Sequence, residues 1–365
     1  MKNQVQVRAE RHRVNLADVA ALAGVSSATA SRSLRGMAKV SPGTRQRVIE
    51  AARELSYTAA LPAAPEFAPG PRKTMAVIVP FITRWFFTTV TAAAVDHLRE
   101  HGYDVLLYHL GSAAVRDDFF SRMPLAGRVD GILVLSAPLN EEHTIALRAL
   151  DIPFVTVGTN VPGAPAVGID AVAAARQAVN HLISLRHRRI GLIFGEADDP
   201  RFEFESSAQR RQGCEEALQA AGLTLPEAMI ATGPHGPEGG AQAMTELLSR
   251  PVLPTAVFAE YDELAIGALW ALRRAGLRVP DDVSVIGIDD HEMASMFDLT
   301  TVAQDARAQG STAAGLLLQL VGADLINPTG RQLLQPTRLV LRGTTAPPAG
   351  PLSRPSGTTR RRSRV

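Results

Sequence analysis

The sequence predicts a small N-terminal helical domain followed by an α/β core of two doubly wound parallel-sheet lobes. From residue 74 onward, continuous apolar stretches of strand length alternate with amphipathic stretches of helical length. This alternation is typical of buried parallel sheets with helices on both faces, and it has too many strands for one small sheet. Charge is also uneven, since residues 1–60 hold ten Lys/Arg and four Asp/Glu in a chain of net charge +2. A basic N-terminal domain on an acidic core indicates that nucleic acid binds the N-terminal domain.

Residues 16–34 predict two short helices joined by a tight turn. Asn15 is the expected N-cap of the first helix, and Gly24 is expected to end it because glycine adopts positive φ without a Cβ clash. Ser26 is expected to cap the second helix, residues 27–34, which has few large apolar residues. A helix of this kind suits the DNA major groove better than a core, as in a helix-turn-helix motif. The alternative is a small αα-corner without a role in DNA binding.

A third helix is expected to start at Ser41-Pro42, where serine is an N-cap and proline takes the first helical position. Its apolar residues recur at helical spacing and would cover the first two helices. The first helix is expected to contribute an apolar side of Val19, Ala20, Leu22 and Ala23. Residues 14–57 therefore predict a helix-turn-helix domain.

Helix geometry selects the side chains that read bases. Ala28 and Arg32 are four residues apart and share one face beside Ser27. Arginine is the commonest specific reader, because its guanidinium binds guanine bidentately. The hydroxyls of Ser26, Thr29 and Ser31 are expected to contact phosphates instead.

The remaining segments outside the core are polar or rich in proline. Residues 1–13 predict a basic flexible lead, and residues 346–365 predict a disordered tail with five arginines. Residues 58–73 predict a linker, since its prolines remove N–H donors and disfavour helix. The core is expected at 74–345, with a first lobe of about 74–170 and 303–335 and a second of about 171–302 and 336–345.

Within the core, the apolar pattern predicts strands and helices in alternation. Strands are expected at 75–79, 103–110, 131–135, 154–157, 190–194, 228–232, 256–258, 284–288, 299–304 and 338–341. Helices are expected at 86–101, 115–123, 141–150, 171–185, 206–221, 238–249, 262–275 and 307–321.

Several functional classes are not supported by the sequence. One cysteine, Cys214, allows neither an intrachain disulfide nor a thiolate metal cluster. We find no P-loop, no G-x-G-x-x-G and no nucleophile elbow, so no catalytic residue, metal site or cofactor is expected. The N-terminus has no signal-peptide pattern and no stretch is long enough to span a membrane, so we expect a cytoplasmic protein without a membrane partner.

Residues 14–57 resemble the DNA-binding domain of LacI-family (LacI/GalR-type) transcriptional regulators. Five segments of the core also resemble this family: DGILVLS (130–136), HLISLRHRRIGLIFG (181–195), PTAVFAEYDELAIGAL (254–269), VPDDVSVIGIDD (279–290) and LTTVAQD (299–305). The resemblance implies a core like type I periplasmic sugar-binding proteins. It also implies a homodimer on a palindromic double-stranded DNA operator, with allosteric control by a small effector bound between the lobes.

The resemblance places family roles on particular residues. Base readers fall on Ser27, Ala28 and Arg32, as helix geometry already suggests. Contacts to the DNA backbone or flanking bases fall on Asn15, Leu16, Ser26, Thr29, Ser31 and Lys39. Effector contacts fall on Arg84, Trp85, Phe86, Phe87, Asp130, Arg210, Tyr261, Asp262 and Asp289.

Some of these effector contacts have a structural alternative. Phe86 and Phe87 are either rings that stack on a sugar or core residues of an amphipathic helix. Asp262 is either a ligand contact or the N-cap of its helix. The bulky Tyr261 stands where the family often has a small polar residue, which leaves the effector's identity open.

The linker departs from the family pattern. Relatives have a short hinge helix with a leucine wedged into the DNA minor groove, but the prolines of residues 58–71 break this pattern. Leu61 or Phe67 would be the substitute wedge.

We therefore expect a transcriptional regulator, a repressor whose carbohydrate effector changes its DNA affinity. A purine or a sugar phosphate is the alternative effector. A sugar-binding receptor without a transcriptional role is the alternative function.

Overall fold

The structure is a computed structural model that describes residues 16–34, 40–55, 72–196, 204–323 and 330–349. The chain divides into two compact units, residues 1–72 and 73–365. The predictions for Asn15, Lys39, Leu61 and Phe67, and for most of both terminal segments, lie outside the described residues.

The N-terminal unit contains α1 (Leu16–Leu22), α2 (Ser27–Leu34) and α3 (Pro42–Glu54). Its core consists of small and β-branched side chains from all of these helices: Val19, Ala20, Ala23, Ala30, Val48, Ala51 and Ala52. Gly24 has a φ of +66° in the turn between α1 and α2, where the left-handed backbone favours glycine. The three predicted helices are thus present in the described residues.

Leu22 is a correction to the predicted apolar side of α1. Its side chain is 47% exposed, whereas Val19, Ala20 and Ala23 are buried. At about 100° per residue, Leu22 lies roughly 100° from the centre of the stripe formed by the other three. A helix of this length buries only that narrow stripe against α2 and α3.

The first lobe of the second unit is a twisted sheet in the order β11-β5-β4-β3-β1-β2. All of its described strand pairs are parallel. The strands are β1 (Thr74–Val79), β2 (Asp104–His109), β3 (Gly131–Leu135), β4 (Phe154–Val157), β5 (Ala166–Gly168) and β11 (Gln332–Leu334). The helices are α4 (Trp85–Glu100), α5 (Ala113–Arg122), α6 (Glu141–Arg148) and α11 (Ala306–Gly322).

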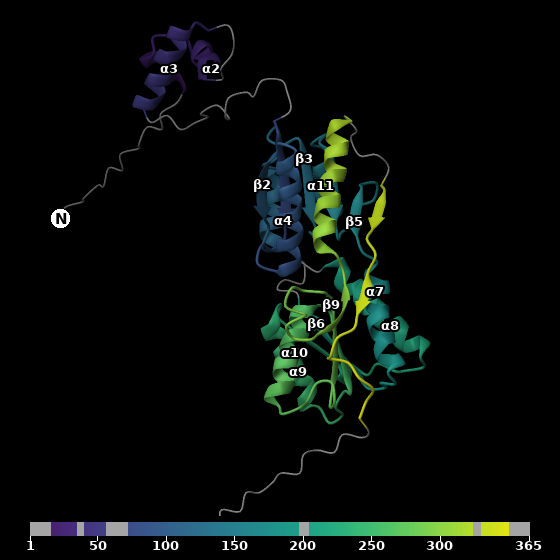
Figure 1. Cartoon of the computed structure of the whole chain (residues 1–365). Helices are drawn as coiled ribbons and strands as arrows, with labels where there is room; N and C mark the ends of the chain where they lie inside the picture. Colours follow the sequence, from purple (N-terminus) through teal and green to yellow (C-terminus); the bar gives the residue numbers. More distant parts are fainter. Residues whose placement is uncertain (1–15, 35–39, 56–71, 197–203, 324–329, 350–365) are drawn as a thin grey trace, which may run out of the picture. The chain divides into compact units, whose positions relative to one another are not determined.

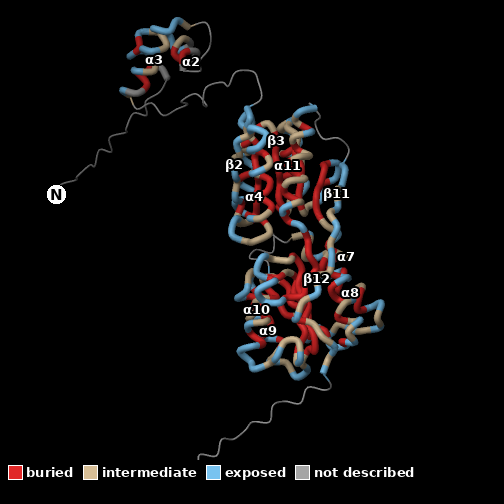
Figure 2. The backbone as a smooth tube through the Cα atoms, in the orientation of Figure 1, coloured by how far each residue is buried: buried red, intermediate tan, exposed pale blue. Residues whose placement is uncertain are grey.

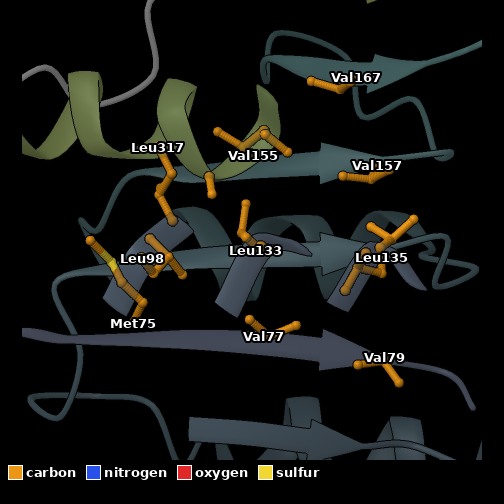
Figure 3. Packing of buried hydrophobic residues seen from close by; sticks show 14 of the residues in the cluster. Met75, Val77, Val79, Leu98, Leu133, Leu135, Val155, Val157, Val167 and Leu317 are labelled. Atoms are coloured by element: carbon orange, nitrogen blue, oxygen red, sulfur yellow. The ribbon is translucent and has the colours of Figure 1, made fainter. Parts of the chain in front are cut away.

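Helices cover both faces of this sheet. On one face, α4 and α11 lie side by side (Figure 1) and pack on alternate residues of β1, β3 and β4. Figure 3 shows Leu98 of α4 and Leu317 of α11 directed at this layer of valines and leucines. A Cβ on Gly310 of α11 would lie 2.3 Å from the Val90 carbonyl oxygen of α4, so glycine permits the close approach of the two helices.

The second lobe repeats this arrangement in the order β12-β10-β9-β8-β6-β7, with only β12 antiparallel to its neighbour among the described pairs. Its strands are β6 (Ile190–Gly195), β7 (Ile230–Gly233), β8 (Ala256–Ala259), β9 (Ser284–Asp289), β10 (Thr300–Ala303) and β12 (Arg338–Val340). Its helices are α7 (Ala171–Ser184), α8 (Glu205–Ala220), α9 (Pro237–Ser249) and α10 (Asp262–Arg274). The central strands β6, β8 and β9 are almost entirely buried, and the outer loops are exposed (Figure 2).

The chain passes between the lobes after β5, after β10 and after β11. The parallel strands therefore present their carboxyl ends to the region between the lobes, where α/β folds bind ligands.

Three local predictions need correction. The strands β5 and β11 were not expected, because three residues are too few for an alternation pattern. Residues 227–229 form a short 3₁₀ helix, so β7 starts at Ile230 rather than at residue 228. Helix α5 begins at Ala113, two residues early, because the Ser112 hydroxyl accepts a hydrogen bond from the Val115 N–H and caps it.

Candidate functional site

Helix α2 carries the predicted base-reading positions. Ala30 and Ser33 are buried on the side that packs in the core of the N-terminal unit. At about 100° per residue, positions 28 and 32 fall on the opposite side of the helix. Ser27 is exposed at the start of the helix. The side chains of Ala28 and Arg32 are not among those described, so their base contacts stay predictions.

The residues that were predicted to contact the DNA backbone are only partly described by the structure. Ser26 caps α2, since its Oγ accepts a hydrogen bond from the Thr29 N–H at 3.2 Å and lies 2.9 Å from Thr29 Oγ1. Both hydroxyls therefore already have partners in the unbound unit. Leu16 and Ser31 lie on helices, but their side chains are not described.

A cavity of about 430 Å³ lies between the two lobes at the carboxyl ends of their strands. Residues of the first lobe contribute one wall, including Arg84, Phe86, Phe87, Ser136, Asn160 and Gln309. Residues of the second lobe contribute the other, including Phe204, Glu205, Arg210, His235, Glu260, Tyr261, Glu263 and Asp289. The structure thus brings together Arg84, Phe86, Phe87, Arg210, Tyr261 and Asp289, all of them predicted effector contacts.

Arg210 and Asp289 form the polar centre of this cavity. Arg210, only 8% exposed, donates from Nη1 to the Glu260 carbonyl oxygen at 2.8 Å, and its Nη2 lies 3.7 Å from Asp289 Oδ1. Gln304 donates to the same Asp289 oxygen at 2.6 Å, and Gln309 donates to Gln304 at 2.9 Å. This chain of hydrogen bonds links a helix of the first lobe to a strand end of the second.

The backbone at Asp289 is strained. Its φ is +136° and that of the following Asp290 is +58°, values that residues with a Cβ rarely adopt. Such conformations persist where the surroundings fix them, often at binding sites. The strain directs the Asp289 carboxylate to a fixed position at the end of β9.

Aromatic rings line the cavity on both sides. Phe204 of the second lobe lies 5.7 Å from Phe87 and 6.2 Å from Phe81 of the first lobe, between ring centres. The Tyr261 and His235 rings stack at 5.7 Å, and the Tyr261 hydroxyl lies 2.6 Å from His235 Nδ1 in a hydrogen bond. Rings with fixed neighbours offer a flat apolar surface to a ligand. Phe87 is buried and Phe86 half-buried, so both also pack in the protein, and the two interpretations of these residues are compatible.

Asp262 does not line the cavity. Its fully buried carboxylate accepts hydrogen bonds from the Thr301 hydroxyl (2.7 Å) and the His291 N–H (2.9 Å). It fits against Gly287, where a Cβ would lie 2.2 Å from Asp262 Oδ1. Asp262 is the first residue of α10 and not its cap, which is Tyr261 without a side-chain cap hydrogen bond. Neither predicted role applies, and Asp262 instead holds the β9 and β10 loops in place.

Asp130 and Trp85 also differ from the prediction. Asp130 precedes β3, and its Oδ2 accepts a hydrogen bond from the Thr74 N–H at 3.3 Å. That position is at the amino ends of the strands, away from the cavity at their carboxyl ends. Trp85 does not line the cavity but contacts His291 across the lobes, with ring centres 5.0 Å apart.

Several polar and aromatic residues of the cavity wall were not predicted from the sequence: Phe204, His235, Glu260, Glu263, Gln304 and Gln309. Glu260 and Gln304 each come directly after the last residue of a strand, a position that could have marked them as candidates. Glu263 lines the cavity, whereas the sequence predicted its neighbour Asp262 as the ligand contact. Phe204 and His235 lie in loops without a comparable signal.

The carboxyl groups near Asp289 resist ionisation. Burial, followed by the Asp289 charge, raises the pKa of Glu263 to about 7 and that of Asp262 to about 7. Burial raises the pKa of Asp289 to about 6, although Arg210 opposes this. These carboxyl groups therefore keep their protons to a higher pH than exposed carboxyl groups do.

We expect Glu263 to make the protein less stable as the pH rises from about 5 to about 7. The folded state holds its proton up to a pKa of about 7, whereas an unfolded glutamate loses it near its ordinary value, so ionisation favours unfolding in this window. The buried His143 and His187 and the half-buried His181 and His291 act in the opposite direction, because burial lowers their pKa values.

A comparison with Glu263→Gln isolates the carboxyl from the histidines. The Tm of the wild-type chain minus that of the variant should be larger at pH 5.5 than at pH 7.5. An equal difference at both values would contradict the raised pKa.

In the described residues, no cluster of histidine, cysteine and acidic side chains is arranged to hold a metal ion. A search of the same residues finds no helix with the length and apolar content needed to cross a membrane.

Comparison with known proteins gives consistent matches along the chain. Residues 15–59 match the model of bacterial regulatory proteins of the lacI family, and residues 179–345 match a periplasmic binding protein-like domain. The HTH-type transcriptional repressor CytR of Escherichia coli (strain K12) is 35% identical over 332 residues, which cover 90% of this chain and 95% of that protein.

Solved structures of similar architecture include two with bound ligands. The transcriptional regulator CelR–cellobiose complex has a TM-score of 0.65 at 32% identity, covering 91% of this chain and 100% of that one. The lac repressor dimer bound to operator and the anti-inducer ONPF has a TM-score of 0.67 at 29% identity, covering 92% and 100%.

Proposed function

The chain belongs to the LacI family of bacterial regulatory proteins, and from this premise we propose that a sugar bound between its lobes controls its binding to a palindromic operator. The chain is a helix-turn-helix transcriptional regulator with an α/β ligand-binding core, and not an enzyme or a receptor without a transcriptional role. The sugar, the homodimer, the palindrome and the residues in contact are the parts that we propose.

The observation that carries the sugar assignment is the pairing of a polar centre with aromatic rings in one cavity. A sugar presents hydroxyls at its rim and apolar C–H groups on its faces. Asp289, Gln304 and Arg210 supply acceptors and donors for hydroxyls, and Phe86, Phe87 and Phe204 supply rings for the C–H face. The cellobiose bound to the similar CelR structure supports a sugar of some kind. Asp130, Asp262 and Trp85 are not part of this proposed contact set.

Control of DNA binding follows from the position of the cavity. Its walls come from different lobes, so a ligand that contacts both favours one relative orientation of the lobes. Contacts across the lobes already exist at Phe204 with Phe87, at Trp85 with His291 and at Asn160 with Glu205. In a homodimer, a change of lobe orientation alters the spacing of the two DNA-binding domains and hence the fit to two half-sites. The similar lac repressor dimer on its operator supports this assembly, which would act in the cytoplasm, where the DNA is.

The test is a selection from a random double-stranded DNA library with the full-length chain, followed by gel shifts on the enriched sequence. We expect a palindromic motif, bound by two copies, and a sugar that changes the affinity at least tenfold. Enrichment of an asymmetric motif bound by one copy would contradict the dimer. An operator affinity that no sugar, purine or sugar phosphate changes would contradict ligand control. A response to a purine or a sugar phosphate alone would move the effector to that class.

A further inference from the structure

The cavity wall carries more negative than positive side chains. Its described lining includes the carboxyl groups of Asp170, Glu205, Glu260, Glu263 and Asp289. The guanidinium groups of the same described lining are those of Arg84 and Arg210. A phosphate or carboxylate ligand would add to this excess of negative charge, whereas a cation would reduce it.

Most of these carboxyl groups already accept hydrogen bonds within the described protein. Asp170 accepts the Ala173 N–H at 2.8 Å as the cap of α7. Glu205 accepts the Gln209 amide at 2.9 Å and the Asn160 N–H at 3.3 Å. The carboxyl groups of these side chains therefore have hydrogen-bond donors within the protein and need none from a ligand.

The same holds for the two carboxyl groups beside Arg210. Glu260 accepts the Gly195 N–H at 2.8 Å and the Ser207 hydroxyl. Asp289 accepts Gln304, as described above.

Glu263 differs from the others. It lies in the first turn of α10 and lines the cavity, yet its carboxyl group makes no hydrogen bond or ion pair with any described residue. Its neighbours in charge are Asp289 at the end of β9, which repels it, and Arg84 before α4, which attracts it from the other lobe. A half-buried carboxyl group without a donor is costly unless a ligand supplies one.

Arg210 carries a second unsatisfied group, which is buried within the cavity wall. Its Nη atoms are directed at Glu260 and Asp289, but its buried Nε has no hydrogen-bond partner among the described residues. Asp289 is the common neighbour of Arg210 and Glu263. Of these two groups, the Glu263 carboxyl group is the one that lines the cavity.

We propose that the effector is an amino sugar, whose ammonium group binds the Glu263 carboxylate. This inference rests on the proposed sugar-binding function and specifies the class of sugar. A hydroxyl would satisfy Glu263 as a donor, but only an ammonium also offsets the excess negative charge.

The test compares sugars that differ only at the amino group. Glucose and glucosamine, galactose and galactosamine, and mannose and mannosamine are titrated into the full-length chain at pH 7 by calorimetry. We expect at least one pair to bind, with the amino member at least tenfold tighter than its neutral counterpart.

Two variants test whether Glu263 causes the preference for the amino sugar over the neutral sugar. Glu263→Gln keeps the size of the side chain and removes its charge, and should reduce the preference for the amino sugar over its neutral counterpart to less than threefold. Glu238→Gln is the matched control, because Glu238 is an exposed glutamate in the first turn of α9, outside the cavity. It should leave the preference unchanged.

Each other outcome contradicts a different part of the proposal. A pair whose neutral member binds as tightly as the amino member overturns the amino-sugar assignment and leaves the sugar-binding function intact. An amino preference that persists in Glu263→Gln overturns the role of Glu263. Binding by no member of any pair, in a chain that melts cooperatively, overturns the assignment to these hexoses and removes the support for a sugar effector. The wild-type comparison decides the ligand class even if the variant does not fold.

Discussion

Replacing Arg210 by alanine should abolish the response of the regulator to its effector and leave operator binding intact. Arg210 lies at the centre of the cavity, with Nη1 on the Glu260 carbonyl, Nη2 near Asp289 and Nε unpaired. Truncating one partner of a buried, hydrogen-bonded charge pair costs about 2–5 kcal/mol. Effector affinity should therefore fall by at least about 30-fold, since each 1.4 kcal/mol is a factor of ten.

The loss has two physical sources. The ligand loses the guanidinium donor, and Asp289 loses the charge that lowers its pKa. An Asp289 that holds its proton is a weaker acceptor for ligand hydroxyls, so the alanine variant damages both halves of the polar centre. Arg210→Lys retains a charge but not the fork of donors, and should recover only part of the affinity.

Arg211→Ala is the matched control for this prediction. Arg211 is the next residue of α8, but it is exposed and pairs with Glu215 on the surface at 3.0 Å. It should change neither effector affinity nor operator affinity. Calorimetry with the effector and gel shifts on the selected operator measure the two quantities. A normal effector response in Arg210→Ala would show that the cavity between the lobes is not the effector site.

The sequence predicts the architecture well because buried parallel strands leave a strong signal. Stretches such as residues 75–79 and 284–288 are continuously apolar, and the helices between them have one polar side. Strands β5 and β11 escape the pattern because three residues fit in almost any connection. Their place in the sheet is set by pairing with each other and by β4 rather than by local sequence.

The candidate site is harder to predict because direction matters more than residue type. Tyr261, Asp262 and Glu263 are consecutive, yet the outer two line the cavity and the middle one is directed inward at Gly287. Only the fold places Gly287 of β9 opposite Asp262. Asp130 is a different case, since its position before β3, at the amino end of the sheet, already argues against a ligand contact.

Replacing Arg32 by alanine should weaken binding to the selected operator by about 5- to 150-fold per half-site, which corresponds to about 1–3 kcal/mol for a bidentate base contact. The position lies on the side of α2 opposite the buried Ala30, which is the side expected to face the major groove. Ser27 and Ala28 supply little hydrogen bonding beside it, so Arg32 should carry most of the direct readout. In a homodimer the loss occurs in both half-sites, and the total effect on a palindrome should exceed that on a single half-site.

The loss should be specific for sequence, and this separates a base reader from a phosphate contact. At one base-pair position of each half-site, the Arg32→Ala variant should bind all four possible base pairs with equal affinity. At the other positions of the operator it should keep the wild-type preference. Arg47→Ala, which removes an exposed arginine of α3, should weaken all sequences uniformly or not at all. Anisotropy titrations on single-base operator variants at one salt concentration measure both. If Arg32→Ala keeps the wild-type preference at every position, the recognition specificity resides elsewhere in the DNA-binding domain, because a lost phosphate contact changes affinity without changing the ranking of sequences.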